Sequence, residues 1–257
     1  MNFRAHSWKL SGSNTALHAL RSLFFALAVS SVLWAAPSDS LAVQVKFKPA
    51  TEGVPFSKEQ RKAMRTIANA TETEVRKLLP TLPRKITLEV RAGGQVIPET
   101  GETGAAVSPG HVRWTIDTGR PEGVMAIVEN HLRTTLFHEF HHLARGWVMS
   151  GGAERTSFMD GVVSEGMATA FQRDFAGGEM PWGTYPDDVE SWVEELEALP
   201  RDARYDQWMF LHTDGRRWIG YRAGTYLVDQ AMRVSGRSSA DLVLTPTHEI
   251  VRLGTTR

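Results

Sequence analysis

The feature that most restricts the fold of this chain is the stretch HEFHH at residues 138–142. It lies in a segment that begins at Pro121, repeats apolar residues at helical spacing and ends at Gly146, which is typical of one amphipathic helix. Each residue of a helix advances about 100°, so His138 and His142 share one face. Two imidazoles one turn apart can bind a single zinc ion, at about 2.0–2.1 Å from each nitrogen. A metal site on this face then requires a third ligand from elsewhere in the chain.

The other polar residues of the stretch have different expected positions. Glu139 falls about 80° from the midpoint of His138 and His142, close enough to reach a metal-bound water without being a ligand itself. The alternative pair, His138 and His141, would leave Glu139 about 130° away from its midpoint and aimed elsewhere. We therefore predict His138 and His142 as the ligands, and His141 as either a neighbour of the site or a hydrogen-bonded surface histidine.

A candidate third ligand, Glu165, follows His142 by 23 residues. It belongs to the segment SEGMA, near the start of a helix predicted from about 161 to 175. Two histidines and one glutamate leave the fourth position of a zinc ion open to water, which is the ligand set of a catalytic site. Such a set also admits iron as an alternative ion.

HEFHH followed by SEGMA resembles the gluzincin metallopeptidases, in which a HExxH helix is followed by a glutamate on a later helix. The arrangement is more closely similar to a bacterial family of predicted zinc-dependent proteases, which has HExxH, EG-L/M-A and GYxxG segments in this order. This chain has GYRAG at 220–224, and the similarity covers roughly residues 85–235. The resemblance implies that Zn²⁺ is bound by His138, His142 and Glu165, with Glu139 as the general base.

Two positions depart from the gluzincin pattern. Ser164 stands where many gluzincin aminopeptidases have an asparagine, and Thr169 stands where thermolysin-like enzymes have an aspartate that orients a ligand. Which group orients the histidines is therefore open. The chain also has no GxMEN-type segment, so the resemblance to aminopeptidases does not extend to recognition of a substrate N-terminus.

Two further features concern the substrate. Tyr221 is the predicted donor to the oxyanion of the transition state, because a tyrosine hydroxyl stays neutral and can donate at pH 7. Packing in the core is the alternative for Tyr221, and Tyr226 and His212 are the alternative donors. The segment HVRWTID at 111–117 is expected to be either an edge strand that holds an extended peptide by backbone hydrogen bonds or an ordinary internal strand.

The rest of the pattern predicts an α+β fold, with a small N-terminal β-sheet, a zincin-like HExxH helix and a mostly helical C-terminal part. Ser57 begins a capping box for a helix that Pro80 ends. The strands are expected at 85–90 and 111–117. The helices after the sheet are expected at 121–146, 161–175, 187–199 and 218–234.

The first 42 residues differ from the rest of the chain. Three basic residues precede an apolar run of 14 residues, 23–36, which is shorter than the roughly 20 residues of a membrane-spanning helix. We expect a secretory signal cleaved after Ala42, with an uncleaved anchor as the alternative. Residues 43–257 would then form a single metallopeptidase domain.

Composition limits the partners and the destination. The chain has no cysteine, and its 29 basic and 29 acidic residues cancel, so neither disulfides nor a nucleic-acid partner are expected. We predict an exported zinc metallopeptidase, periplasmic or secreted, that acts on a peptide or protein and is not inserted in the membrane after signal removal. The sequence leaves the oligomeric state open. The alternatives are a non-catalytic zinc-binding or interaction module and a zinc amidohydrolase acting on a cell-wall amide.

Overall fold

The computed structural model describes residues 42–49, 54–178 and 180–256. These residues belong to one compact unit, Ser40–Arg257. The expected signal segment, residues 1–42, lies outside the described residues except for Ala42, so the cleavage site and the domain boundary stay predictions. Among the described residues, no helix combines the length and apolar content needed to cross a membrane.

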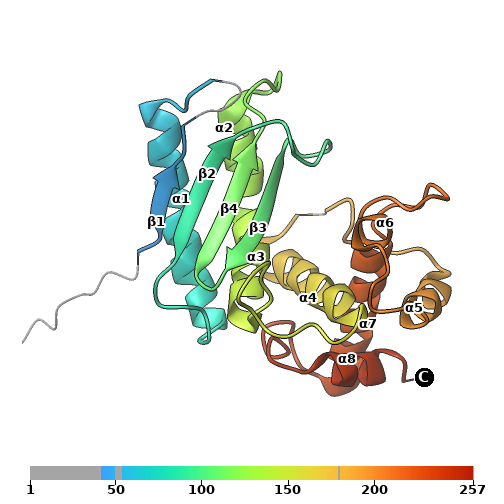
Figure 1. Ribbon diagram of the computed structural model, residues 1–257. Coiled ribbons are helices and arrows are strands. Elements are labelled where there is room, and N and C mark those ends of the chain that lie inside the picture. Colours follow the sequence, from blue (N-terminus) through green and yellow to red (C-terminus); the bar gives the residue numbers. More distant parts are fainter. Residues whose placement is uncertain (1–41, 50–53, 179, 257) are drawn as a thin grey trace, which may run out of the picture. The chain divides into compact units, whose positions relative to one another are not determined.

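A four-stranded sheet occupies the N-terminal part of the described chain, with the strand order β1-β2-β4-β3 (Figure 1). The pairing of β2 with β1 and with β4 is parallel, and β3 pairs antiparallel with β4. The strands at 85–90 and 111–117 were predicted and are confirmed as β2 and β4. The bounds are Gln44–Phe47 for β1, Thr87–Ala92 for β2, Glu102–Ser108 for β3 and His111–Ile116 for β4.

The edge of the sheet nearest to the HExxH helix is β3, not β4. The strand β4 lies between β2 and β3, so the internal-strand alternative for 111–117 holds and the edge-strand alternative is wrong. The glycine-rich interval before β4 favours either a loop or an irregular hairpin by its sequence, and the hairpin is the alternative that holds. It forms β3, which pairs with β4 through six residue pairs and one irregularity, so pairing overrides the low strand propensity of ETGAAVS.

Helices cover one face of the sheet (Figure 1). The first, α1 (Lys58–Leu78), begins with the predicted capping box between Ser57 and Gln60 and ends before Pro80. The segment predicted as one helix at 121–146 is continuous but contains three elements, α2 (Gly123–Ile127), the π-helical η1 (Val128–Leu132) and α3 (Arg133–Arg145). Gly146 ends α3 in the left-handed conformation, with a φ of 79°, where glycine carries no steric cost.

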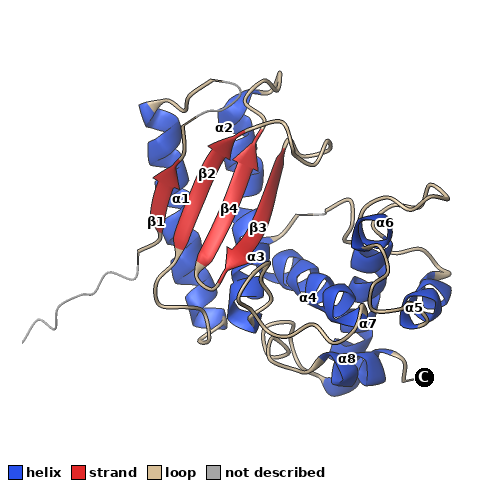
Figure 2. Cartoon of the chain, viewed as in Figure 1, coloured by secondary structure: helices blue, strands red, loops and turns tan. Residues whose placement is uncertain are grey.

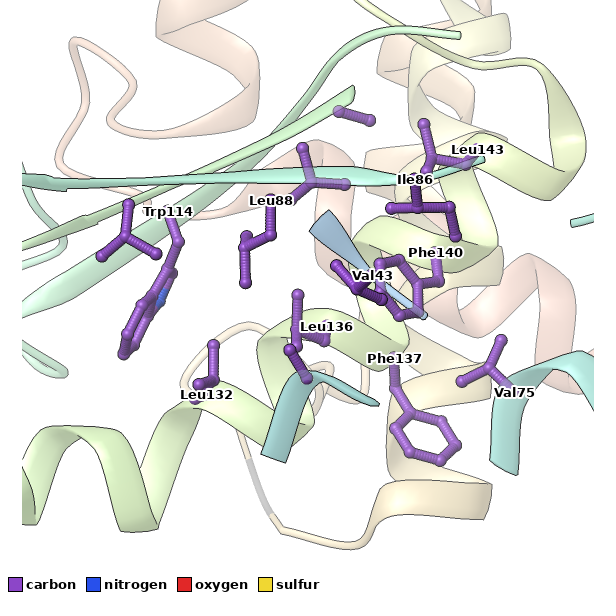
Figure 3. Packing of buried hydrophobic residues seen from close by; sticks show 14 of the residues in the cluster. Val43, Val75, Ile86, Leu88, Trp114, Leu132, Leu136, Phe137, Phe140 and Leu143 are labelled. Atoms are coloured by element: carbon purple, nitrogen blue, oxygen red, sulfur yellow. The ribbon is translucent and has the colours of Figure 1, made fainter. Parts of the chain in front are cut away.

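The core between the sheet and the helices forms because successive side chains of each strand point to opposite faces of the sheet. Trp114 on β4 and Leu88 on β2 are fully buried and point toward Leu132, Leu136 and Phe140 of the helical segment (Figure 3). The opposite face of the sheet is polar, and there Glu89 pairs with the side chains of Lys48, Arg91 and Arg113. One apolar and one polar face are typical of a small sheet that is covered on one side.

The C-terminal part of the described chain is helical and has its own core (Figure 2). The helix α4 is buried along most of its length, because it packs against both α3 and α7. The α+β architecture with a mostly helical C-terminal part was predicted and is confirmed. The bounds are Met159–Ala176 for α4, Val189–Glu197 for α5, Tyr205–Met209 for α6, Ile219–Ser235 for α7 and Thr247–Gly254 for α8.

The helices α4 and α7 cross backbone to backbone at two glycines. A Cβ atom added to Gly166 would lie 2.1 Å from the carbonyl carbon of Gly224, and one added to Gly224 would lie 2.0 Å from the carbonyl oxygen of Val162. No side chain fits at either position. The glycines of SEGMA and GYRAG therefore fix the crossing that places Glu165 and Tyr221 at the same site.

Candidate metal centre

Three predicted ligands meet where α3 and α4 pack together. Ligand atoms of His138, His142 and Glu165 all lie within 4.8 Å of one another, and all three residues are buried. The two Nε2 atoms are 3.0 Å apart, and Glu165 Oε2 is 3.1 Å from each of them. Tetrahedral zinc with bonds of about 2.0–2.1 Å places its ligand atoms about 3.3 Å apart. The group therefore fits a zinc ion after a shift of a few tenths of an ångström.

The charges of Glu165, His138 and His142 also favour the binding of a cation. Burial disfavours the charged form of Glu165, yet the neighbouring His142 and His138 rings hold its pKa well below the ordinary range. When the imidazoles are neutral and protonated at Nδ1, the convergent atoms are all acceptors. A divalent cation satisfies such a set, because each of its ligands supplies a lone pair.

Glu139 lies beside the ligands without joining them. It is buried on α3, and burial raises the pKa of its carboxyl group, against the influence of His138 and His142. The edge strand β3 passes directly over it, so that a Cβ atom on Gly104 would come within 2.6 Å of Glu139 Oε1. A non-ligating carboxyl group of raised pKa next to a metal site is suited to carry a proton.

Two tyrosines complete the surroundings of the ligands. The ring of Tyr221 stacks on His138 at a centroid distance of 6.4 Å. Burial and the nearby Glu165 raise its pKa well above the ordinary value, so the hydroxyl is a neutral donor. Tyr205 places its hydroxyl 3.5 Å from Glu165 Oε1. Tyr205 was not predicted, because α6 has only five residues and gives no periodic signal.

The alternative donors lie elsewhere. The Tyr226 hydroxyl donates to Glu190 at 2.8 Å, and His212 Nδ1 lies 2.9 Å from Asp214. Neither side chain lines a cavity next to the ligands. Of the three candidates, Tyr221 is the one that the structure brings to the site.

His141 is a buried neighbour of the site and not a surface residue. Its ring is fully buried, 5.4 Å from the ring of Phe171. Burial lowers its pKa well below the ordinary value, which keeps the imidazole neutral. The surface alternative is therefore wrong, and the neighbour alternative is confirmed.

Gln172 is the best candidate for orienting a ligand. The Nδ1 atom of His138 is buried and has no hydrogen-bond partner among the described residues, and the same holds for the amide oxygen of Gln172. Both residues line one cavity, and Gln172 is among the groups that raise the pKa of His138. Since Gln172 lies seven residues after Glu165, helical spacing places both on the same face of α4. That spacing is the sequence signal that could have identified it.

Two cavities flank the ligands. The larger, of about 410 Å³, is lined by Trp147, Met149, Arg155 and Tyr205 together with the ligands. The smaller, of about 130 Å³, is lined by Glu102, Thr135, Trp182 and Trp218. The residues common to both linings are Gly104, His138, Glu139, Phe210 and Tyr221. The candidate metal centre thus lies at the junction of two spaces that can receive different parts of one ligand.

The model of the family described as "Predicted Zn-dependent protease (DUF2268)" matches residues 56–252. The chain belongs to this family. The predicted resemblance to zinc-dependent proteases of this type is thereby confirmed, and the zinc dependence in the family's description agrees with the ligand group found here.

Comparisons with individual proteins are less informative. No curated protein matches the chain. A crystal structure of an aminopeptidase N family protein from Idiomarina loihiensis is similar with a TM-score of 0.42 and 12% sequence identity, over 82% of this chain and 40% of that one. The chain therefore spans about two fifths of the length of that protein.

Proposed function

We propose that this chain is an exported zinc metallopeptidase that hydrolyses peptide bonds in a peptide or protein substrate, with Glu139 as the general base. The observation that carries this proposal is the group of three ligands, His138, His142 and Glu165, with a non-ligating carboxyl group beside them. Structural zinc sites use four protein ligands. A site that only stores or fixes zinc has no need of Glu139.

Different residues of the chain would bind the metal and transfer the proton. Zinc held by His138, His142 and Glu165 would act as a Lewis acid and lower the pKa of a coordinated water from about 15.7 toward 7. Glu139 takes the proton from the attacking water and delivers it to the nitrogen of the leaving amine. The raised pKa of Glu139 brings its proton affinity closer to that required for both transfers.

The oxyanion that forms on the scissile carbonyl needs a hydrogen-bond donor. Tyr221 is placed for this role, because it lines both cavities and its hydroxyl stays protonated well above neutral pH. Tyr205 lies across Glu165 from it and lines the larger cavity. A neutral donor in a site shielded from water stabilises developing charge more strongly than one in solvent.

An extended peptide is the substrate that best matches the edge of the sheet. The carbonyl groups of Glu102 and Ala106 on β3 point away from β4, since they accept bonds from Ile97 and Met149. Because residues of a strand alternate, the N–H and C=O of Gly104 face the same outer edge, and they lack a backbone partner in the described part of the chain. A peptide added at this edge would lie over Glu139.

Glu139→Gln tests the proposal. The variant should lose peptide hydrolysis by a factor of about 10²–10⁴, measured with a library of internally quenched peptides and the zinc-loaded protein. Its zinc content, measured by elemental mass spectrometry, should stay at the wild-type value. Retained hydrolysis would remove Glu139 from the mechanism, and a wild-type protein that binds zinc but cleaves no member of the library would favour a binding module.

A further inference from the structure

The smaller cavity has an unusual distribution of charge. Glu102 and Glu139 both line it, whereas no lysine or arginine does so among the residues that the structure describes. Glu102 is 3% exposed. Its Oε2 accepts hydrogen bonds from Trp114 Nε1 at 2.6 Å and from Thr135 Oγ1 at 3.0 Å. Both donors are neutral, so the cavity contains a buried carboxyl group without a positive partner.

Such a carboxyl group has a high energetic cost in its charged form. Burial raises the pKa of Glu102, and Glu139 adds to the effect. A buried acid of this kind gains most from a cation placed next to it, because the cation replaces the solvation that burial removed. Neither the fold nor the proposed hydrolysis otherwise requires an ionisable group at this position.

Part of the cavity wall is aromatic. Trp182 and Trp218 pack against each other at 5.1 Å, and Trp218 also contacts Phe210 and Tyr221 at 5.7 Å. Trp218 has a φ of 61°, a left-handed conformation that a bulky residue rarely adopts and that often marks a functional site. Aromatic faces pack on methylene groups and attract cations. Together with Glu102, they match a long aliphatic side chain that ends in a positive charge.

The direction of β3 indicates on which side of the scissile bond the smaller cavity would lie. A peptide added antiparallel to β3 runs from the Ser108 end of the strand toward the Glu102 end. If its scissile carbonyl lies at Glu139, next to Gly104, the following residue lies on the Glu102 side. The larger cavity, which includes Met149 and Arg155, then receives the residues before the scissile bond.

We propose that the smaller cavity is a subsite for lysine or arginine in the residue that follows the scissile bond, with Glu102 as the partner of the positive charge. This inference rests on the proposed function, since it names the substrate class of the same site. It goes beyond that function because Glu102, Trp182 and Trp218 take no part in the hydrolysis itself.

The test separates binding from cleavage. Phosphinic peptides, which cannot be hydrolysed, are prepared with lysine or norleucine directly after the phosphinate group, and their Kd values for the zinc-loaded protein are measured by calorimetry. The wild-type protein should bind the lysine peptide about 30-fold or more tightly than the norleucine peptide, the order of effect expected for one partner of a buried charge pair. In Glu102→Gln, the two Kd values should differ by less than about threefold.

A matched control and the contrary outcomes complete the experiment. Glu99 pairs with Arg217 and does not line the cavity, so Glu99→Gln should keep the wild-type ratio of Kd values. Equal affinity for both peptides in the wild type, no binding of either, or a lysine preference that survives in Glu102→Gln would each overturn the subsite. Failure of the proposed function would appear separately, as absence of cleavage of the corresponding normal peptide while the lysine preference in binding persists.

Discussion

His138 and His142 lie one turn apart on α3, whereas Glu165 and Tyr221 reach the same site from α4 and α7. The first pair is positioned by the geometry of a single helix, within the core formed by the sheet, α1 and α3. The second pair belongs to helices of the other core, and the contact of Gly166 with Gly224 sets its spacing. Half of the site is thus locally determined, and the other half depends on packing between distant segments.

The largest effect is expected when one zinc ligand is removed from each half of the site. His142→Ala and Glu165→Ala should both weaken zinc binding by a factor on the order of 10²–10³, since each removes a share of a binding free energy of about 10–16 kcal/mol. Zinc affinity is measured by competition with a chromophoric chelator.

The exposed His248 provides a control, because His248-Glu249 repeats the start of the motif away from the site. His248→Ala should leave the zinc affinity unchanged. If Glu165→Ala bound zinc as tightly as the wild type, the helical half would not belong to the metal centre.

A second experiment tests the packing that supports the helical half. Gly224→Ala places a methyl group against the Val162 carbonyl oxygen and should lower the free energy of unfolding by about 2–3 kcal/mol, or the Tm by roughly 5–10 °C. Denaturant and thermal unfolding measure both quantities.

Gly93→Ala is the matched control for this substitution. Its added Cβ atom would make only an ordinary contact with Thr115, at 3.4 Å, so little change in stability is expected. Equal stabilities of the two variants would mean that α4 and α7 are not held together at Gly224.

A smaller effect on zinc affinity is expected from a change of Gln172, the candidate for orienting His138. Gln172→Ala should weaken zinc binding by about 10–100-fold, the usual result of removing a hydrogen-bond partner of a ligand, with an unchanged far-UV circular dichroism spectrum. Gln172→Glu, which keeps an acceptor, should restore most of the affinity. Thr169→Val should change it by less than about threefold, and the reverse order of effects would assign the orienting role to Thr169.

The smallest predicted effect is a pH dependence of stability. Because the pKa of Glu102 is raised above 4.5 in the folded protein, its contribution to stability is fully present below about pH 4.5 and is lost as the pH rises through the folded pKa. The stability of Glu102→Gln relative to the wild type should therefore increase between about pH 4.5 and pH 8. Urea unfolding at a series of pH values measures this difference, and a difference that decreases with pH would contradict the burial of a neutral Glu102.

The locally determined half of the site was also the half that sequence alone could specify. Helical spacing separated His142 from His141 and placed Glu139 beside the ligands. Glu165 was identified from its distance and its motif, but its approach to the histidines depends on the packing of α4 against α3, which no local rule predicts. Tyr221 was predicted as the oxyanion donor from the chemistry of its hydroxyl group alone. Its stacking on His138 is seen only in the structure.

The strand β1 and several site residues escaped prediction, and β3 was predicted only as one of two alternatives, for a related reason. The strand β3 contains Gly104 because the HExxH helix leaves no room for a side chain above Glu139, and that glycine weakened the local strand pattern. The burial of Glu102 could not be predicted, since it arises from contacts with Trp114 and Thr135, which are 12 and 33 residues away. Among the described residues, the short strand β1 pairs with β2 alone.

The contact between Gly166 and Gly224 also affects the motions of the site. It joins two main chains and contains no rotatable side-chain bond, so the rotamer changes that occur within nanoseconds cannot alter it. Only a displacement of whole helices, which takes microseconds or longer, could change the spacing of the backbones at Glu165 and Tyr221. Side chains on the walls, such as the half-exposed Phe210, can move much faster. The site thus combines a rigid centre with walls that can adapt to ligands of different shape.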